Sequence, residues 1–199
     1  GSEVTLSALE AGAVDFVTKP RAESASQLVS YADEICDKIR AAHGARLRSA
    51  PRAARPDAAV TAPIGVSPAP TFGGGVLSGR LLGEHIVAIG ASTGGTEAIK
   101  DVLLGLPADS PGIVITQHMP PGFTRAFAER LNRFSALEIR EAADGDLLLP
   151  GRVLIAPGGY NLELVRQGNG AIARICAPQK KHRYVPSVDI LFDSAAPIF

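Results

Sequence analysis

Two short motifs carry side chains able to do chemistry, and each directly follows an apolar run. The first is Gly90-Ala91-Ser92-Thr93-Gly94-Gly95, after residues 86–89. It matches G-x-S-x-G, a sharp strand-to-helix turn that presents a serine hydroxyl. The following helix aims its free amide groups at the same point, where an oxyanion can form. Taken alone, the motif is equally compatible with a glycine-rich turn in which Ser92 or Thr93 caps the helix.

The second motif is Gln117-His118-Met119-Pro120-Pro121, after residues 113–116. In a parallel sheet the carboxyl ends of the strands meet at one edge, so His118 is placed to reach Ser92 as a general base. A single histidine is more often structural than catalytic, but two signals at neighbouring strand ends favour a nucleophile–base pair. The other histidines stand at a helix end, before a strand and in a loop, as His43, His85 and His182.

The strongest rival is a dinucleotide-binding loop, because Gly-Ala-Ser-x-Gly after a first strand also binds phosphates in short-chain dehydrogenases. That hypothesis predicts an acidic residue or arginine at the end of the second strand, where Gln117-His118 stands instead. It also predicts Tyr-x-x-x-Lys. The three tyrosines, Tyr31, Tyr160 and Tyr184, are followed at that spacing by Ile35, Leu164 and Val188. The cofactor hypothesis fails both tests, and we expect neither a cofactor nor a bound metal.

The elements that must position these residues alternate from His85 onward. Short apolar runs predict buried strands, and apolar residues three or four apart predict helices. Strands are expected at 86–89, 113–115, 137–141 and 153–155, a hairpin at 162–166 and 171–175, and helices at 96–106, 123–134 and from Ser187 onward. This order predicts an α/β fold with a doubly wound parallel sheet and helices on both faces.

Residues 1–43 contain two helical patterns around one short apolar run. Leu6 and Leu9 suit the apolar side of a helix that ends near Gly12, and residues 28–42 predict a second amphipathic helix. Between them Asp15-Phe16-Val17-Thr18 predicts a strand that Pro20 stops. Three such elements cannot bury a full core, so we expect the end of a domain whose beginning lies upstream.

Residues 44–83 are rich in proline, alanine and glycine and show no helical or strand period, which predicts a flexible linker before a second domain at 84–199. Twenty basic residues balance twenty acidic ones, so no overall charge favours nucleic acid or a membrane surface. Cys36 and Cys176 lie far apart, as expected for apolar thiols in a reducing compartment. No membrane span or signal pattern is apparent, and we expect a cytoplasmic protein.

Four blocks of the second domain resemble chemotaxis methylesterases of the CheB type, in the order found in that family. They are Ile89 to Ile99, Gln117 to Thr124, Ala156-Pro157-Gly158, and His182-Arg183 followed by Pro186-Ser187-Val188-Asp189. Glu10 to Pro20 resembles the last part of a response-regulator receiver domain with a flavodoxin-like fold. Receiver, linker and esterase are the family's own arrangement.

The resemblance implies hydrolysis of glutamyl methyl esters on chemoreceptors to glutamate and methanol, and deamidation of certain receptor glutamines. Ser92 would be the nucleophile and His118 the base, with Thr93, Gly94 and Met119 in the substrate and oxyanion region. A chemotaxis histidine kinase would phosphorylate the receiver, where Lys19 would contact the phosphoryl group. A non-catalytic regulator that binds receptor or kinase through the same surface is the remaining alternative.

Two aspartates of the family pattern are not found in this sequence. The phosphate-accepting aspartate is expected before Gly1, and the aspartate that orients the base is expected in a Gly-rich stretch after Phe199. Asp144, Asp146, Asp189 and Asp193 do not stand in that stretch. The esterase domain is therefore expected to be incomplete at its C-terminus, and the third triad member is not assigned.

The linker hypothesis predicts rapid cleavage of the native protein by trypsin at Arg46, Arg48, Arg52 or Arg55. Exposed, mobile segments are cut before folded ones. Limited proteolysis with mass spectrometry of the fragments measures this, and protection of all four sites would show instead that the segment is docked.

Overall fold

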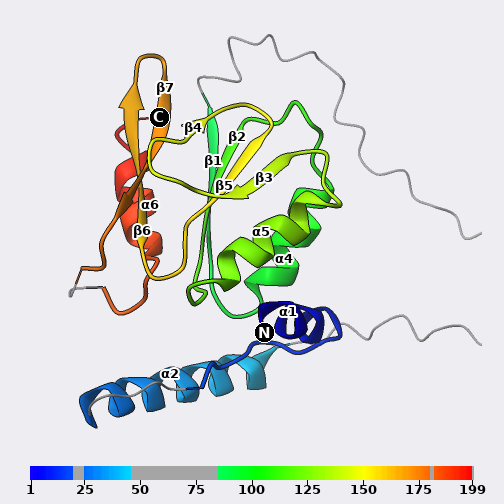
Figure 1. Ribbon diagram of the computed structural model, residues 1–199, viewed down its shortest axis with the longest axis vertical. Helices are drawn as coiled ribbons and strands as arrows, with labels where there is room; N and C mark the ends of the chain where they lie inside the picture. The colour runs from blue at the N-terminus through cyan, green and yellow to red at the C-terminus, as the bar shows by residue number, and fades with distance from the viewer. Residues whose placement is uncertain (20–24, 46–84, 180–181, 199) are drawn as a thin grey trace, which may run out of the picture.

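The chain from residue 85 onward is organised around one parallel sheet. The computed structural model describes residues 1–19, 25–45, 85–179 and 182–198 (Figure 1). Four parallel strands run in the spatial order β1-β2-β5-β3. Their bounds are β1 Ile86–Ala91, β2 Gly112–Gln117, β5 Arg152–Ile155 and β3 Glu138–Glu141. The predicted α/β fold with a parallel sheet is confirmed.

Strand β2 shows why its central run, residues 113–115, is apolar at three successive positions. Ile113 and Ile115 pack into a core beneath helices α4 (Gly95–Leu104) and α5 (Phe123–Asn132). Val114 points to the opposite face and packs into a second core. Successive side chains of a strand alternate between faces, so a strand covered on both sides needs apolar residues throughout.

The second face is covered by a hairpin and a helix (Figure 1). Strands β6 (Asn161–Gln167) and β7 (Gly170–Cys176) form the expected hairpin, and helix α6 (Val188–Ala195) packs beside it. The Ser187 side chain accepts a hydrogen bond from the Ile190 amide and so caps α6. Strand β4 (Leu147–Leu148) adds a third, antiparallel strand to the hairpin, and its two residues are too few to show a sequence period.

The N-terminal segment contains both predicted helices, α1 (Ser2–Glu10) and α2 (Ala25–Gly44). The predicted strand at 15–18 is wrong, because residues 13–19 have no regular structure. The backbone amides and carbonyls of a strand need hydrogen-bond partners on a neighbouring strand. At Phe16, side chains supply these partners instead. The Phe16 amide donates to Asp15, and the Phe16 carbonyl accepts from Lys38 Nζ at 2.7 Å. The predicted linker falls almost entirely within residues 46–84, which lie outside the described residues.

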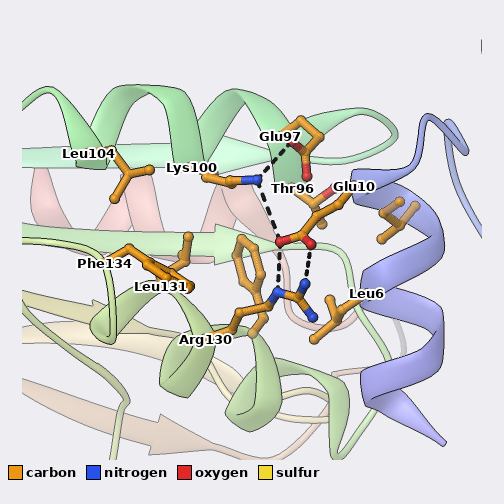
Figure 2. A pocket seen from close by; sticks show the side chains of 11 residues that line it. Leu6, Glu10, Thr96, Glu97, Lys100, Leu104, Arg130, Leu131 and Phe134 are labelled. Carbon is orange, nitrogen blue, oxygen red and sulfur yellow. Dashed lines mark hydrogen bonds and ion pairs between the residues drawn. The ribbon is translucent and has the colours of Figure 1, made fainter. Parts of the chain in front are cut away.

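Helix α1 lies against α4 and α5 of the second domain (Figure 1). Leu6 and Leu9 are both buried in the core beneath those helices. Figure 2 shows Glu10 between Lys100 of α4 and Arg130 of α5, and its carboxylate forms ion pairs with both. The N-terminal segment is therefore joined to the second domain by apolar and ionic contacts. None of the described helices is long and apolar enough to cross a membrane.

Two adjacent leucines of α4 test the packing of the core. Leu103 is fully buried, whereas Leu104 is 41% exposed. Leu103→Ala should lower the free energy of unfolding by about 2–5 kcal/mol, because it removes buried methyl groups and leaves a cavity. Leu104→Ala should cost much less. Urea denaturation of both variants measures the difference, and equal losses would mean that α4 packs through another face.

Candidate active site

The pairing of β1 with β2 brings the two predicted catalytic residues together. Ala91 pairs with Gln117 at the carboxyl ends of the strands, and the next residues are Ser92 and His118. The His118 amide donates to the Ala91 carbonyl at 2.9 Å, which extends the ladder to the histidine. Neighbouring strands lie about 4.8 Å apart, so the register itself places the side chains within reach of each other.

The side chains meet as a nucleophile–base pair requires. Ser92 Oγ lies 3.2 Å from His118 Nδ1. Ser92 is exposed and His118 is half-buried. A serine hydroxyl that donates to Nδ1 requires the ring proton to be on Nε2. The neutral imidazole is then positioned to accept the serine proton at Nδ1, and its Nε2–H is available to a further acceptor.

Gln117 joins the two predicted catalytic residues through their backbones. Its side chain is buried, and its Nε2 donates to the carbonyl of Ser92 at 3.0 Å and to that of His118 at 3.2 Å. One amide group therefore fixes both strand ends relative to each other. The sequence analysis did not assign this role to Gln117. A polar residue at the end of an otherwise apolar strand was the available signal.

The three glycines around Ser92 are required for different steric reasons. A Cβ atom at Gly90 would lie 2.4 Å from the side chain of Val188 in α6. A Cβ atom at Gly95 would lie 2.2 Å from Gln117 Oε1. Gly94 caps α4 with a φ of 79°, a conformation that residues with a Cβ rarely adopt. The tight turn that exposes Ser92 therefore depends on close packing as well as on backbone freedom.

Thr124, at the start of α5, connects the segment after His118 to the loop that contains Gly158. Its side chain is fully buried, donates to Glu141 at 2.5 Å and accepts from the Gly158 amide at 2.9 Å. Two of the sequence blocks that resemble the family, around His118 and around Gly158, are thus in direct contact. Thr124 is a second positioning residue that the sequence analysis did not single out.

A cavity of about 710 Å³ opens beside Ser92 and His118, and the N-terminal segment forms part of its wall. Met119 lines it from the catalytic domain, and Asp15 and Asp37 line it from the N-terminal segment. Thr93 donates a hydrogen bond to Asp15 at 2.6 Å, and the Phe16 ring stacks on Phe123 at 4.7 Å. The described residues of the N-terminal segment that line the cavity therefore restrict access to it.

The other predicted site residues are placed as follows. Thr93 and the buried Met119 line the cavity, and Gly94 lies at the N-terminus of α4. Lys19 is exposed and does not line the cavity, although its neighbour Thr18 does. The structure thus gathers Ser92, His118, Thr93 and Met119 and leaves Lys19 apart. The chemical roles of all six residues stay predictions.

Among the described residues, no carboxylate forms a hydrogen bond with the His118 ring. Asp144 accepts from the Ile175 amide, and Asp146 pairs with Arg140. Asp189 acts on His118 through its charge and Asp193 is exposed. None of the four aspartates therefore orients the imidazole by direct contact.

Burial lowers the pKa of His118 below its usual value of 6.5, and the charge of Lys38 lowers it further. The charge of Asp189 raises that pKa, but less than burial lowers it. Burial disfavours the charged imidazolium, so the ring is neutral at neutral pH. A neutral ring is the form that accepts a proton, as a general base must.

An NMR titration of the His118 ring tests this electrostatic description. The midpoint should lie below 6.5, the usual value. Asp189→Asn should move it further down, because the substitution removes the charge that stabilises the imidazolium. A midpoint above 6.5, or an upward shift in Asp189→Asn, would contradict the description.

Comparisons with known proteins identify the family of this chain. The sequence model of the family described as CheB methylesterase matches residues 87–199. A protein-glutamate methylesterase/protein-glutamine glutaminase of Pseudomonas aeruginosa is 51% identical over 98% of this chain and 52% of its own length. One of Salmonella typhi is 46% identical over 98% of this chain and 52% of its own length. The chain thus spans about half the length of the curated relatives it matches.

A solved structure gives the same result for the fold. The CheB methylesterase catalytic domain of Thermotoga maritima superposes with a TM-score of 0.55 and 42% sequence identity. The match covers 57% of this chain and 61% of that domain. With the family model matching more than half of its residues, this chain belongs to the CheB methylesterase family.

Proposed function

We propose that this chain is part of a protein-glutamate methylesterase that hydrolyses glutamyl methyl esters on chemoreceptors and deamidates certain receptor glutamines. The observation that carries the proposal is the 3.2 Å contact between Ser92 Oγ and His118 Nδ1 beside an open cavity. Membership of the CheB methylesterase family and the names of the relatives supply the substrate class. The arrangement favours an enzyme over a non-catalytic regulator, for which an aligned nucleophile and base would serve no purpose.

In the proposed reaction, His118 takes the proton of Ser92 as the hydroxyl attacks the ester carbonyl. The backbone amides at the start of α4 stabilise the negative oxygen of the tetrahedral intermediate. The imidazolium of His118 then gives its proton to the departing methoxide, which leaves as methanol. Water, deprotonated by His118, attacks the acyl-serine, and the proton returns to Ser92 as glutamate is released. Thr93, Gly94 and Met119 shape the space around the ester.

The proposed mechanism also needs a carboxylate at Nε2 of His118. This group would hold the ring proton on Nε2 and stabilise the imidazolium that forms during attack. Since no described carboxylate hydrogen-bonds the ring and the relatives are about twice as long as this chain, we assign it to sequence outside these 199 residues. The chain by itself should therefore be a poor esterase.

We further propose that residues 1–43 belong to a receiver domain whose phosphorylation by a chemotaxis histidine kinase controls the esterase. Supporting this, Asp15 bonds to Thr93 directly beside the nucleophile, and α2 lines the cavity. Movement of this segment would open the cavity to a protein substrate. Lys19 would contact the phosphoryl group within the complete receiver.

The proposed reaction is tested by removing the pair singly and together in a chain extended to the length of its relatives. Ser92→Ala should lower methanol release from methylated receptor by roughly 10⁴–10⁶-fold. His118→Ala should cost about as much, and the double variant should lose little more, because the two residues act as one unit. Circular dichroism serves as the folding control. Near-normal activity of Ser92→Ala, or multiplication of the two single losses, would contradict the mechanism.

A further inference from the structure

One face of helix α2 lies over the mouth of the active-site cavity. Glu34, Asp37, Lys38 and Ala41 all line it. Their spacing of three and four residues places them on the same side of a helix. Two of the four are carboxylates and one is a lysine that pairs with Glu34, so a helix face with a carboxylate free of that lysine, Asp37, borders the cavity.

Asp37 is the residue of this face that contacts the segment before α6. Its Oδ2 forms an ion pair with the Arg183 guanidinium at 2.7 Å and accepts a hydrogen bond from the Tyr184 hydroxyl at 3.1 Å. The guanidinium also lies 5.3 Å from the centre of the Tyr184 ring, which keeps the two donors together. Burial raises the pKa of Tyr184, and its hydrogen bond to Asp37 raises it further, so the hydroxyl keeps its proton and remains a donor.

Tyr184 also contacts the general base. Its ring stacks on the His118 imidazole with a centroid separation of 4.8 Å and an interplanar angle of 22°. The two donors are therefore held at a fixed place beside the catalytic pair, on the segment that leads into α6. A carboxylate bound there contacts Tyr184, which in turn contacts the general base His118.

We propose that Arg183 and Tyr184 form a carboxylate clamp that binds an acidic side chain on the helical substrate segment carrying the glutamyl methyl ester. In this structure Asp37 occupies the clamp in place of that side chain. The proposal rests on the proposed esterase function and adds to it a rule of substrate selection. An ester with a carboxylate one helical turn away is preferred over the same ester with a neutral neighbour.

The chemistry of the clamp favours a carboxylate over an amide. A guanidinium carries a full positive charge and attracts a carboxylate but not a neutral amide, and hydrogen bonds to charged groups are stronger than those to neutral ones. Arg183 is 58% exposed and Asp37 is 37% exposed, so water weakens the interaction. We therefore expect a preference of about threefold to tenfold rather than an absolute requirement.

Two helical peptides with one glutamyl methyl ester each provide the test. One carries glutamates three and four residues to either side of the ester, and the other carries glutamines there. The ratio of their kcat/KM values is measured by methanol release with a chain extended to the length of its relatives. Arg183→Gln also frees α2, but that release raises activity on both peptides equally, so the ratio reports the clamp alone.

The wild-type protein should prefer the acidic peptide, and Arg183→Gln should reduce the ratio to about one. Tyr184→Phe, which keeps the stacked ring but loses the hydroxyl, should give an intermediate ratio. Arg133→Gln, which removes an exposed arginine at the end of α5, is the matched control and should keep the wild-type ratio. An unchanged ratio in Arg183→Gln, or no preference in the wild type, overturns the clamp.

Failure of the esterase function is distinguishable from failure of the clamp. If the wild type releases methanol from neither peptide, the proposed function fails, and fluorescence anisotropy with labelled peptides then tests the clamp by binding alone. Tighter binding of the acidic peptide that is lost in Arg183→Gln supports the clamp. Equal binding of both peptides to wild type overturns it.

Discussion

The register between β1 and β2 is the constraint on which the active site depends. Because Ala91 pairs with Gln117, the next two residues, Ser92 and His118, emerge side by side at the same sheet edge. A slip of one residue would turn the side chains of one strand to the opposite face and separate the pair. The buried cores on both faces of β2 hold that register, and the Gln117 side chain locks it at its end. The geometry of the Ser92–His118 pair therefore follows from strand packing.

The N-terminal segment contacts residues at the same edge of the sheet and covers the cavity there. Leu6 and Leu9 anchor α1 on the helices of the catalytic domain, while Asp15 reaches Thr93 and Asp37 reaches Arg183. The anchor buries two leucines and adds the ion pairs of Glu10, whereas the contacts of Asp15 and Asp37 at the cavity are polar and partly exposed. Exposed polar contacts contribute little stability, so the covering part of the segment is more easily displaced than α1.

Much of this arrangement could be predicted from the sequence, because apolar runs and G-x-S-x-G report local structure. The continuous apolar run within β2 predicted that this strand is buried. The positions of the two motifs predicted that Ser92 and His118 lie at neighbouring strand ends. The strand expected at Asp15–Thr18 failed because strand formation depends on a neighbour that no local pattern contains. The roles of Gln117 and Tyr184 could not be predicted for the same reason. The hydrogen bond of Gln117 to Ser92 and the stacking of Tyr184 on His118 join segments that are distant in the chain.

The most direct test of the central claim is to locate the nucleophile chemically. A serine-reactive fluorophosphonate applied to a chain extended to the length of its relatives, followed by peptide mass spectrometry, identifies the modified residue. The account predicts a single adduct on Ser92, formed at least about 10²-fold more slowly when His118 is replaced by glutamine, because the base no longer activates the hydroxyl. An adduct on another residue, or labelling of Ser92 at an unchanged rate without His118, would contradict it.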